Sequence, residues 1–167
     1  MKIKLPTKQF IFPTLLLLLP ALAAAESISG RVVAVADGDT LTILSHEKTE
    51  IKIRLAAIDA PEKAMPYGQR SKQSLSDLCF NKSASIEVID TDRFGRTVGV
   101  VTCDRVNANE TQVKAGMAWV YRKYAEGFGH LYPLEEAAKK SKRGLWADPD
   151  ALAPWEWRKN NKNGRRP

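Results

Sequence analysis

Three short segments of this chain gather acidic and basic side chains that suit phosphate chemistry. Asp37-Gly38-Asp39-Thr40 places two carboxylates in a tight turn, and Arg54-Leu55-Ala56-Ala57-Ile58-Asp59-Ala60-Pro61-Glu62 ends an apolar run with two more. Asp92-Arg93-Phe94-Gly95-Arg96 sets an arginine directly after another turn. Carboxylate oxygens are the ligands that Ca²⁺ prefers, and the planar fork of arginine matches phosphate oxygens. Each segment alone could be a solvated turn, and their occurrence together in one chain strengthens the functional interpretation of each.

Strands are predicted on either side of these segments. Residues 28–36, 40–45 and 49–58 are rich in Val, Ile, Leu and Thr, which predicts three antiparallel strands. Apolar and polar residues alternate in the third strand, and this alternation places Arg54 on its polar face. Two further strands, at about 84–90 and 96–102, are joined by a hairpin turn over residues 91–95.

Helices are predicted in the connections and after the last strand. They cover about residues 68–79, 107–114 and 133–142, and the last two are followed by glycines that favour a helix end. Five short strands with about three helices predict an α+β fold, built on a five-stranded β-barrel of the OB type. Trp155 and Trp157 lie in a later apolar stretch and are expected to pack on this body.

In their order and spacing, the three segments resemble the staphylococcal nuclease (thermonuclease) family. The resemblance covers about residues 28–147, including Gly144-Leu145-Trp146. Pro154-Trp155-Glu156-Trp157-Arg158 is similar to a C-terminal feature of secreted bacterial members. The resemblance implies the OB-fold barrel and calcium-dependent endonuclease hydrolysis of phosphodiester bonds in DNA and/or RNA.

The resemblance also implies a set of cation ligands. Asp39 and Asp59 correspond to the family's calcium-binding carboxylates, and the main-chain carbonyl of Ala60 would be a third ligand. Many members have threonine at the position of Ala60, so this chain differs in the side chain but keeps the liganding atom. Asp37 is assigned a supporting place around the metal.

Catalytic and substrate-binding residues follow from the same resemblance. Glu62 corresponds to the residue usually described as the general base for the attacking water. Arg54 and Arg96 correspond to the two arginines that hold the scissile phosphate and stabilise charge in the transition state. Nucleotide contacts are expected from aromatic side chains, with Phe94 at a position that is often tyrosine: Phe94, Tyr121 and Tyr124.

The net charge of +7 is unevenly distributed along the chain. Three lysines and no acid lie in residues 1–25, and five bases and no acid lie in residues 158–167. The part between them is nearly neutral, so polyanion binding must come from locally placed arginines, a bound cation or the basic end. We expect residues 26–157 to form one nuclease-like OB-fold domain, a monomer, and residues 158–167 to form a basic disordered tail.

The first 25 residues have the pattern of a signal peptide. A lysine-containing start precedes an apolar stretch at 10–22, and Ala23-Ala24-Ala25 provides a small-residue cleavage site. The uncharged run of 17 residues is shorter than the roughly 20 that span a bilayer. We therefore predict export to a periplasm or the medium, with no stable membrane association after cleavage. A retained membrane anchor is the alternative.

Export would affect the two cysteines. In an oxidising compartment, Cys79 and Cys103 are more readily joined in a disulfide than used as a metal pair, because the chain has no CxxC motif. The alternative is two separately buried thiols.

Two other functions remain open at this point. A non-catalytic OB-fold module could bind single-stranded nucleic acid, although clustered carboxylates would repel that ligand unless a cation intervened. A secreted calcium-stabilised structural domain would explain the carboxylates but not the arginines.

Overall fold

The computed structural model of the protein describes residues 27–162, so the predicted signal peptide lies outside the described residues. Antiparallel pairing joins five long strands: β1 (Ser27–Val35), β2 (Thr40–Ser45), β3 (Glu50–Leu55), β5 (Ser83–Thr91) and β6 (Thr97–Cys103). A parallel pairing of β3 with β6 then closes the sheet into a barrel. The predicted five-stranded OB-type barrel is confirmed.

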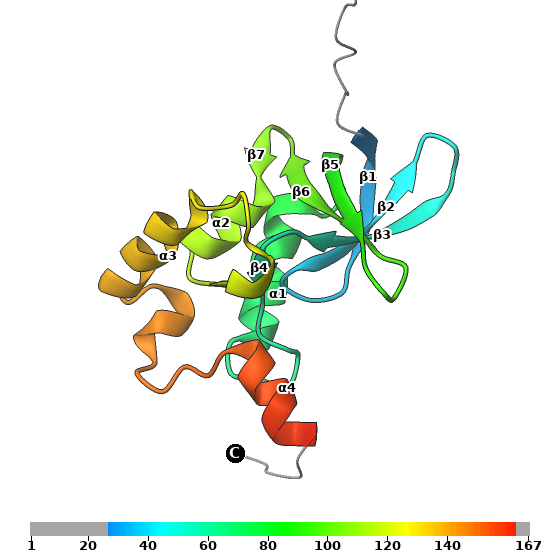
Figure 1. The fold of residues 1–167 in the computed structure, drawn as a ribbon. Helices are drawn as coiled ribbons and strands as arrows, with labels where there is room; N and C mark the ends of the chain where they lie inside the picture. The colour runs from blue at the N-terminus through cyan, green and yellow to red at the C-terminus, as the bar shows by residue number, and fades with distance from the viewer. Residues whose placement is uncertain (1–26, 163–167) are drawn as a thin grey trace, which may run out of the picture.

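The helices lie to one side of the long strands and below them in the view of Figure 1. The helices are α1 (Gly68–Cys79), α2 (Ala108–Lys114), α3 (Leu131–Lys140) and α4 (Pro154–Lys162). The shorter elements are β4 (Ile58–Asp59), β7 (Val106–Asn107), β8 (Trp119–Val120) and the 3₁₀ turns η1 (Arg122–Tyr124) and η2 (Gly144–Ala147). In Figure 1, α2 and α3 lie side by side next to the barrel, and α4 lies at the opposite end of the molecule from β7. None of the helices within residues 27–162 is long and apolar enough to span a bilayer.

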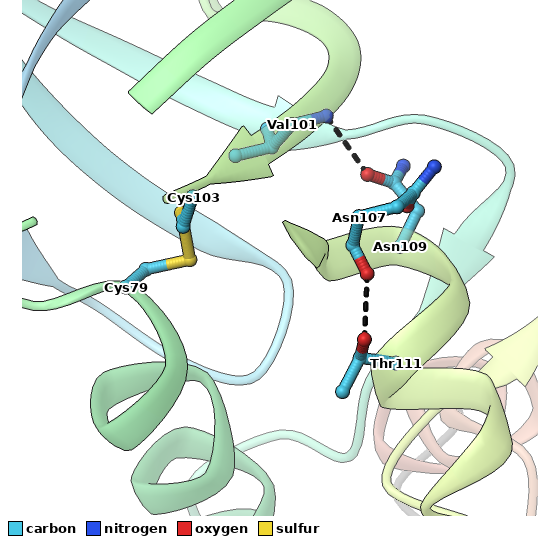
Figure 2. The surroundings of a disulfide bond; sticks show 6 residues. All are labelled: Cys79, Val101, Cys103, Asn107, Asn109 and Thr111. Carbon is cyan, nitrogen blue, oxygen red and sulfur yellow. Dashed lines mark hydrogen bonds between the residues drawn. A yellow bond between two sulfur atoms is a disulfide. The ribbon is translucent and has the colours of Figure 1, made fainter. Parts of the chain in front are cut away.

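Alternate side chains of the strands fill the barrel. Leu41 and Ile43 of β2 and Ile53 and Leu55 of β3 point inward and are almost fully buried, as period-two alternation requires. At the barrel wall, a disulfide joins Cys79 at the end of α1 to Cys103 at the end of β6, with their Cα atoms 5.3 Å apart (Figure 2). The predicted disulfide is therefore present in the structure, and it ties the first helix to the strand that closes the barrel.

The third strand is shorter than predicted. We expected it to run from 49 to 58, but β3 ends at Leu55 because Ala57 adopts a left-handed conformation with φ of 62°. A buried asparagine of α2 stabilises this bend: Asn109 donates from Nδ2 to the carbonyl oxygen of Ala56 at 2.9 Å and accepts from the Val101 N–H at 2.9 Å (Figure 2). The bend starts β4 in a new direction, which β4 keeps by pairing with β8.

The end of the described chain also differs from the expectation. Residues 158–162 were expected to be disordered, but they belong to α4. Pro154 at the first helical position and Glu156 in the first turn both favour a helix start there. Trp155 packs against the cluster formed by Trp119, Leu145 and Ala153, as expected for this stretch, and this packing holds α4 on the body.

Candidate active site

The turn between β1 and β2 presents Asp39. Its N–H donates to Asp37 Oδ1 at 3.1 Å, so Asp37 shapes the turn. Gly38 packs so closely on α1 that a Cβ atom there would collide with the Ser71 side chain. Behind the turn, the fully buried Gln112 of α2 donates from Nε2 to the Gly38 carbonyl oxygen at 2.7 Å. Buried groups of two helices therefore fix the position of Asp39.

Arg54 joins the two predicted calcium-binding carboxylates. Its Nη1 lies 2.9 Å from Asp39 Oδ2, and its Nη2 lies 3.0 Å from Asp59 Oδ1. The β2–β3 register places Thr40 opposite Arg54, which brings Asp39 and Arg54 to the same end of the barrel. Asp39 Oδ2 also accepts from the N–H of Ala60 at 2.6 Å. The two carboxylates are only 5% and 2% exposed, so this is a buried cluster of charge.

Burial dominates the protonation of these carboxylates. It raises the pKa of Asp39 against the lowering effect of Arg54, and the nearby carboxylates of Asp37 and Asp59 raise it further. Burial also raises the pKa of Asp59, against hydrogen bonds from Arg158 and the charge of Arg54. Raised pKa values mean that the surroundings do not fully stabilise the ionised forms. An additional positive charge at this position would do so.

The donor chemistry of Asp39 and Asp59 fits a divalent cation. Both present hard carboxylate oxygens, both are buried, and Ala60 lines the same cavity. Within residues 27–162, no group of three or more His, Cys, Asp or Glu side chains is arranged to hold a metal ion. A cation here would therefore draw its other ligands from main-chain carbonyls and water, both of which Ca²⁺ accepts.

The second predicted arginine reaches the same cluster through a threonine. Arg96 Nη1 donates to Thr40 Oγ1 at 3.4 Å, and Thr40 Oγ1 donates to Asp39 Oδ1 at 3.1 Å. Asp92 holds the other side of the guanidinium: its Oδ2 accepts from Arg96 Nε at 2.8 Å. The structure thus places Arg96 beside the cavity without a direct contact to the buried carboxylates.

Glu62 has an unexpected partner, Arg158 of α4. Arg158 Nη1 lies 2.8 Å from Glu62 Oε1, and Nη2 lies 2.6 Å from Asp59 Oδ2. We counted Arg158 among the bases of a disordered tail, and no sequence motif that we identified marked it as a site residue. The helix-start signals at Pro154 and Glu156 could have indicated the helix, but not its docking position.

Aromatic side chains line part of the cavity, including the three that were expected to contact nucleotides. Phe94 is 70% exposed, with the guanidinium of Arg96 5.7 Å from its ring centroid. The ring of Tyr121 meets Tyr124 edge to face, with centroids 5.0 Å apart. The other partner of Tyr121 is Trp155 of α4, stacked with centroids 5.2 Å apart and planes inclined by 3°. Trp155 therefore supports a residue of this aromatic wall, a contact that the sequence did not predict.

The carboxylates, arginines and predicted aromatic residues of the site line one cavity of about 850 Å³. That volume lies within the usual range of small-molecule sites, roughly 300–1,000 Å³. The structure brings together every predicted catalytic, metal-binding and substrate-binding residue and adds Arg158; the lining includes Asp37, Asp39, Arg54, Asp59, Ala60, Glu62, Phe94, Arg96, Tyr121, Tyr124 and Arg158.

An OB-type barrel that combines two phosphate-matching arginines with buried carboxylates defines a class of phosphodiester-handling proteins. A family model described as "Staphylococcal nuclease homologue" matches residues 52–148. The chain belongs to the staphylococcal nuclease family.

Similar proteins support this assignment over most of the chain. A protein named micrococcal nuclease from Shigella flexneri is 38% identical over 156 residues, covering 87% of this chain and 89% of that protein. A protein described as an uncharacterized endonuclease from Haemophilus influenzae is 41% identical over 157 residues, covering 93% of this chain and 88% of that protein. Protein ParB of Escherichia coli is 37% identical over 161 residues, covering 90% of each chain. The two relatives that are named as nucleases support a nuclease function.

Proposed function

We propose that this protein is an exported, calcium-dependent endonuclease that hydrolyses phosphodiester bonds in DNA and/or RNA. The observation that carries the proposal is the meeting of five side chains around one cavity: Asp39, Arg54, Asp59, Glu62 and Arg96. Family membership supports the nuclease chemistry, and the motif resemblance supports calcium as the cation.

Asp39, Asp59 and the main-chain carbonyl of Ala60 would hold the cation. When bound, the cation would supply positive charge to the phosphate oxygens and relieve the excess negative charge of the two buried carboxylates. Mg²⁺ should be a poor substitute, because it demands near-ideal octahedral geometry and releases its water reluctantly.

The protein's own side chains account for the remaining chemistry. Arg54 and Arg96 bind the scissile phosphate and stabilise the charge that develops in the transition state. Glu62 takes a proton from water as the water oxygen forms a bond to phosphorus. The ester P–O bond breaks, and the leaving oxygen takes a proton from solvent. This reaction uses both the carboxylates and the arginines, whereas a module that only binds nucleic acid would not need the carboxylates.

The aromatic wall is proposed to bind the nucleotides that flank the scissile bond. Phe94 offers an exposed ring for base stacking, and Tyr121 and Tyr124 face the same cavity. Stacking on aromatic faces tolerates different bases, so we expect this wall to bind nucleotides with little sequence preference.

Export is proposed from the signal-like segment at residues 1–25, with a monomer as the working state. The disulfide between Cys79 and Cys103 agrees with an oxidising destination, because such bonds are rare where thiols are kept reduced.

A cleavage assay tests the proposal. Supercoiled plasmid, single-stranded DNA and RNA are each incubated with the protein in Ca²⁺, in Mg²⁺ or in EDTA. We expect cleavage in Ca²⁺, little in Mg²⁺ and none in EDTA, and none by an Asp39→Asn, Asp59→Asn double variant. Nucleic-acid binding without cleavage in Ca²⁺ would favour the binding-module alternative, and full cleavage in EDTA would overturn the calcium assignment.

A further inference from the structure

Arg158 spans two carboxylates of the site with one guanidinium group. Nη2 contacts Asp59 Oδ2 at 2.6 Å, while Nη1 contacts Asp59 Oδ1 at 3.3 Å and Glu62 Oε1 at 2.8 Å. Within residues 27–162, Arg158 is the only side chain that forms a hydrogen bond or ion pair with the Glu62 carboxylate. Both oxygens of Asp59 are engaged by arginines, because Arg54 also contacts Oδ1.

The helix that carries Arg158 also covers the aromatic wall. Trp155, three residues earlier on α4, stacks on Tyr121 with nearly parallel rings. Trp155 therefore covers one face of the Tyr121 ring. One helix therefore contacts both the carboxylates and a tyrosine of the wall proposed for nucleotides.

This arrangement conflicts with the chemistry proposed for the same residues. A guanidinium and a divalent cation on Asp59 repel each other, and both draw on the same two oxygens. Arg158 also occupies Oε1 of Glu62, an oxygen that would otherwise be open to accept a proton from water. Arg158 thus opposes both the cation role of Asp59 and the base role of Glu62.

We propose that Arg158 is an internal counter-ion of the cation-free site. It neutralises Asp59 and Glu62, competes with the divalent cation for Asp59, and releases both carboxylates when the cation binds, which loosens α4. The inference rests on the proposed function, because it requires Asp59 to be a cation ligand.

Calorimetric titration with Ca²⁺ in the absence of substrate tests the competition. The variants are Arg158→Gln, Lys159→Gln and Asp59→Asn in the full chain. Lys159→Gln is the matched control, since Lys159 is exposed on the same helix, forms no ion pair within residues 27–162, and loses the same charge. We expect Arg158→Gln to bind Ca²⁺ at least about fivefold more tightly than the wild type, the lower end of usual coupling between sites. Lys159→Gln should bind as the wild type does, and Asp59→Asn should lose binding.

The outcomes separate the two proposals. If the wild type and Arg158→Gln both bind no Ca²⁺, the cation site itself is overturned, and the counter-ion role is overturned with it. If the wild type binds Ca²⁺ and Arg158→Gln binds equally or less tightly, only the counter-ion role is overturned. An equal gain in Arg158→Gln and Lys159→Gln would show a general charge effect and would also overturn it.

Hydrogen exchange of the α4 amides provides a second readout that does not depend on activity. In the wild type, α4 should exchange faster with saturating Ca²⁺ than in EDTA. In Arg158→Gln, α4 should exchange fast in both conditions, because the ion pairs of Arg158 with Asp59 and Glu62 are absent. Unchanged or slower exchange of wild-type α4 in Ca²⁺ would overturn the displacement.

Discussion

Asp92 holds Arg96 through two nitrogens of one guanidinium, within a single hairpin turn. Oδ2 of Asp92 lies 2.8 Å from Nε and 2.7 Å from Nη2 of Arg96. The other oxygen, Oδ1, accepts from the backbone N–H of Phe94 at 2.9 Å and of Arg96 at 3.1 Å. One carboxylate therefore shapes the turn and aims its arginine at the cavity.

Replacing Asp92 by Asn should lower kcat by about tenfold or more, because a small misplacement of a group that contacts the phosphate is costly. KM should change less. Asp104→Asn is the control, since Asp104 is an exposed aspartate in a different turn. Steady-state kinetics on a short oligonucleotide measures both, and equal kcat values for the two variants would contradict the positioning role of Asp92.

The same residue gives a pH prediction. Burial of Asp92 acts to raise its pKa, but the hydrogen bonds from Arg96 outweigh it, so the pKa lies below the ordinary 3.8. The ionised side chain therefore stabilises the folded state fully above about pH 4, and this stabilisation is lost as the pH falls through the folded-state pKa. Urea unfolding at several pH values should show a gap between the wild type and Asp92→Asn that is constant at neutral pH and closes in acid. A difference in unfolding free energy that grows in acid would contradict the lowered pKa of Asp92.

Lysine at either phosphate-binding arginine should reduce turnover strongly. Arg54→Lys and Arg96→Lys retain the charge but lose the planar fork, so each should lower kcat by about two orders of magnitude, as removal of a transition-state hydrogen-bond donor does. Substrate affinity should fall less. Kinetics of the two single variants and the double variant tests this, and an undiminished kcat in the double variant would refute the assignment.

Replacing Asp39 and replacing Glu62 should affect different properties, Ca²⁺ binding in the first case and the reaction rate in the second. Asp39→Ala should weaken Ca²⁺ binding, measured by titration without substrate, because it removes a proposed ligand. Glu62→Gln should leave the cation bound and slow the reaction, measured as single-turnover rate at saturating Ca²⁺. Loss of Ca²⁺ binding in Glu62→Gln would instead place Glu62 among the ligands.

Gln112 supports the site from the protein interior. Its Nε2 donates to the Gly38 carbonyl, and its Oε1 accepts from Ser74 Oγ at 2.6 Å. Gln112→Ala leaves these buried partners unsatisfied and should lower the free energy of unfolding by about 1–3 kcal/mol. Gln73→Ala, at an exposed position of α1, should change it by less than about 0.5 kcal/mol. Similar losses for the two variants, measured by urea unfolding, would contradict this role.

Local pattern was sufficient for the strand that carries Arg54, because alternation alone placed that side chain on the polar face. Local pattern was not sufficient to predict the bend after Leu55, because no residue type around Ala57 favours the left-handed conformation that Ala57 adopts. That conformation depends on Asn109, which lies 53 positions from the carbonyl that it binds. The residues that form a helix can be predicted from local sequence, but the residues against which the helix packs cannot.

Arg158 is a second case in which local sequence could not predict a contact between distant residues. Its contact with Asp59 spans 99 positions, and a run of basic residues is normally a solvated end. Motif resemblance identified Asp39, Asp59 and Arg96 because a family pattern already contains their spatial relation. The C-terminal segment that contains Arg158 also resembled the family, but that resemblance gave Arg158 no role, so only the three-dimensional structure places it in the site.

The disulfide has a consequence for a chain exposed to proteases. Cys79 and Cys103 lie on either side of the β5–β6 hairpin, so the exposed turn that carries Arg93 and Phe94 belongs to a covalent ring. A single cut in that turn would leave both parts of the chain linked through sulfur. The nicked protein would remain one covalent molecule, heavier by a single water, until a reductant was added, and the barrel strands on both sides of the cut would remain tethered for re-pairing.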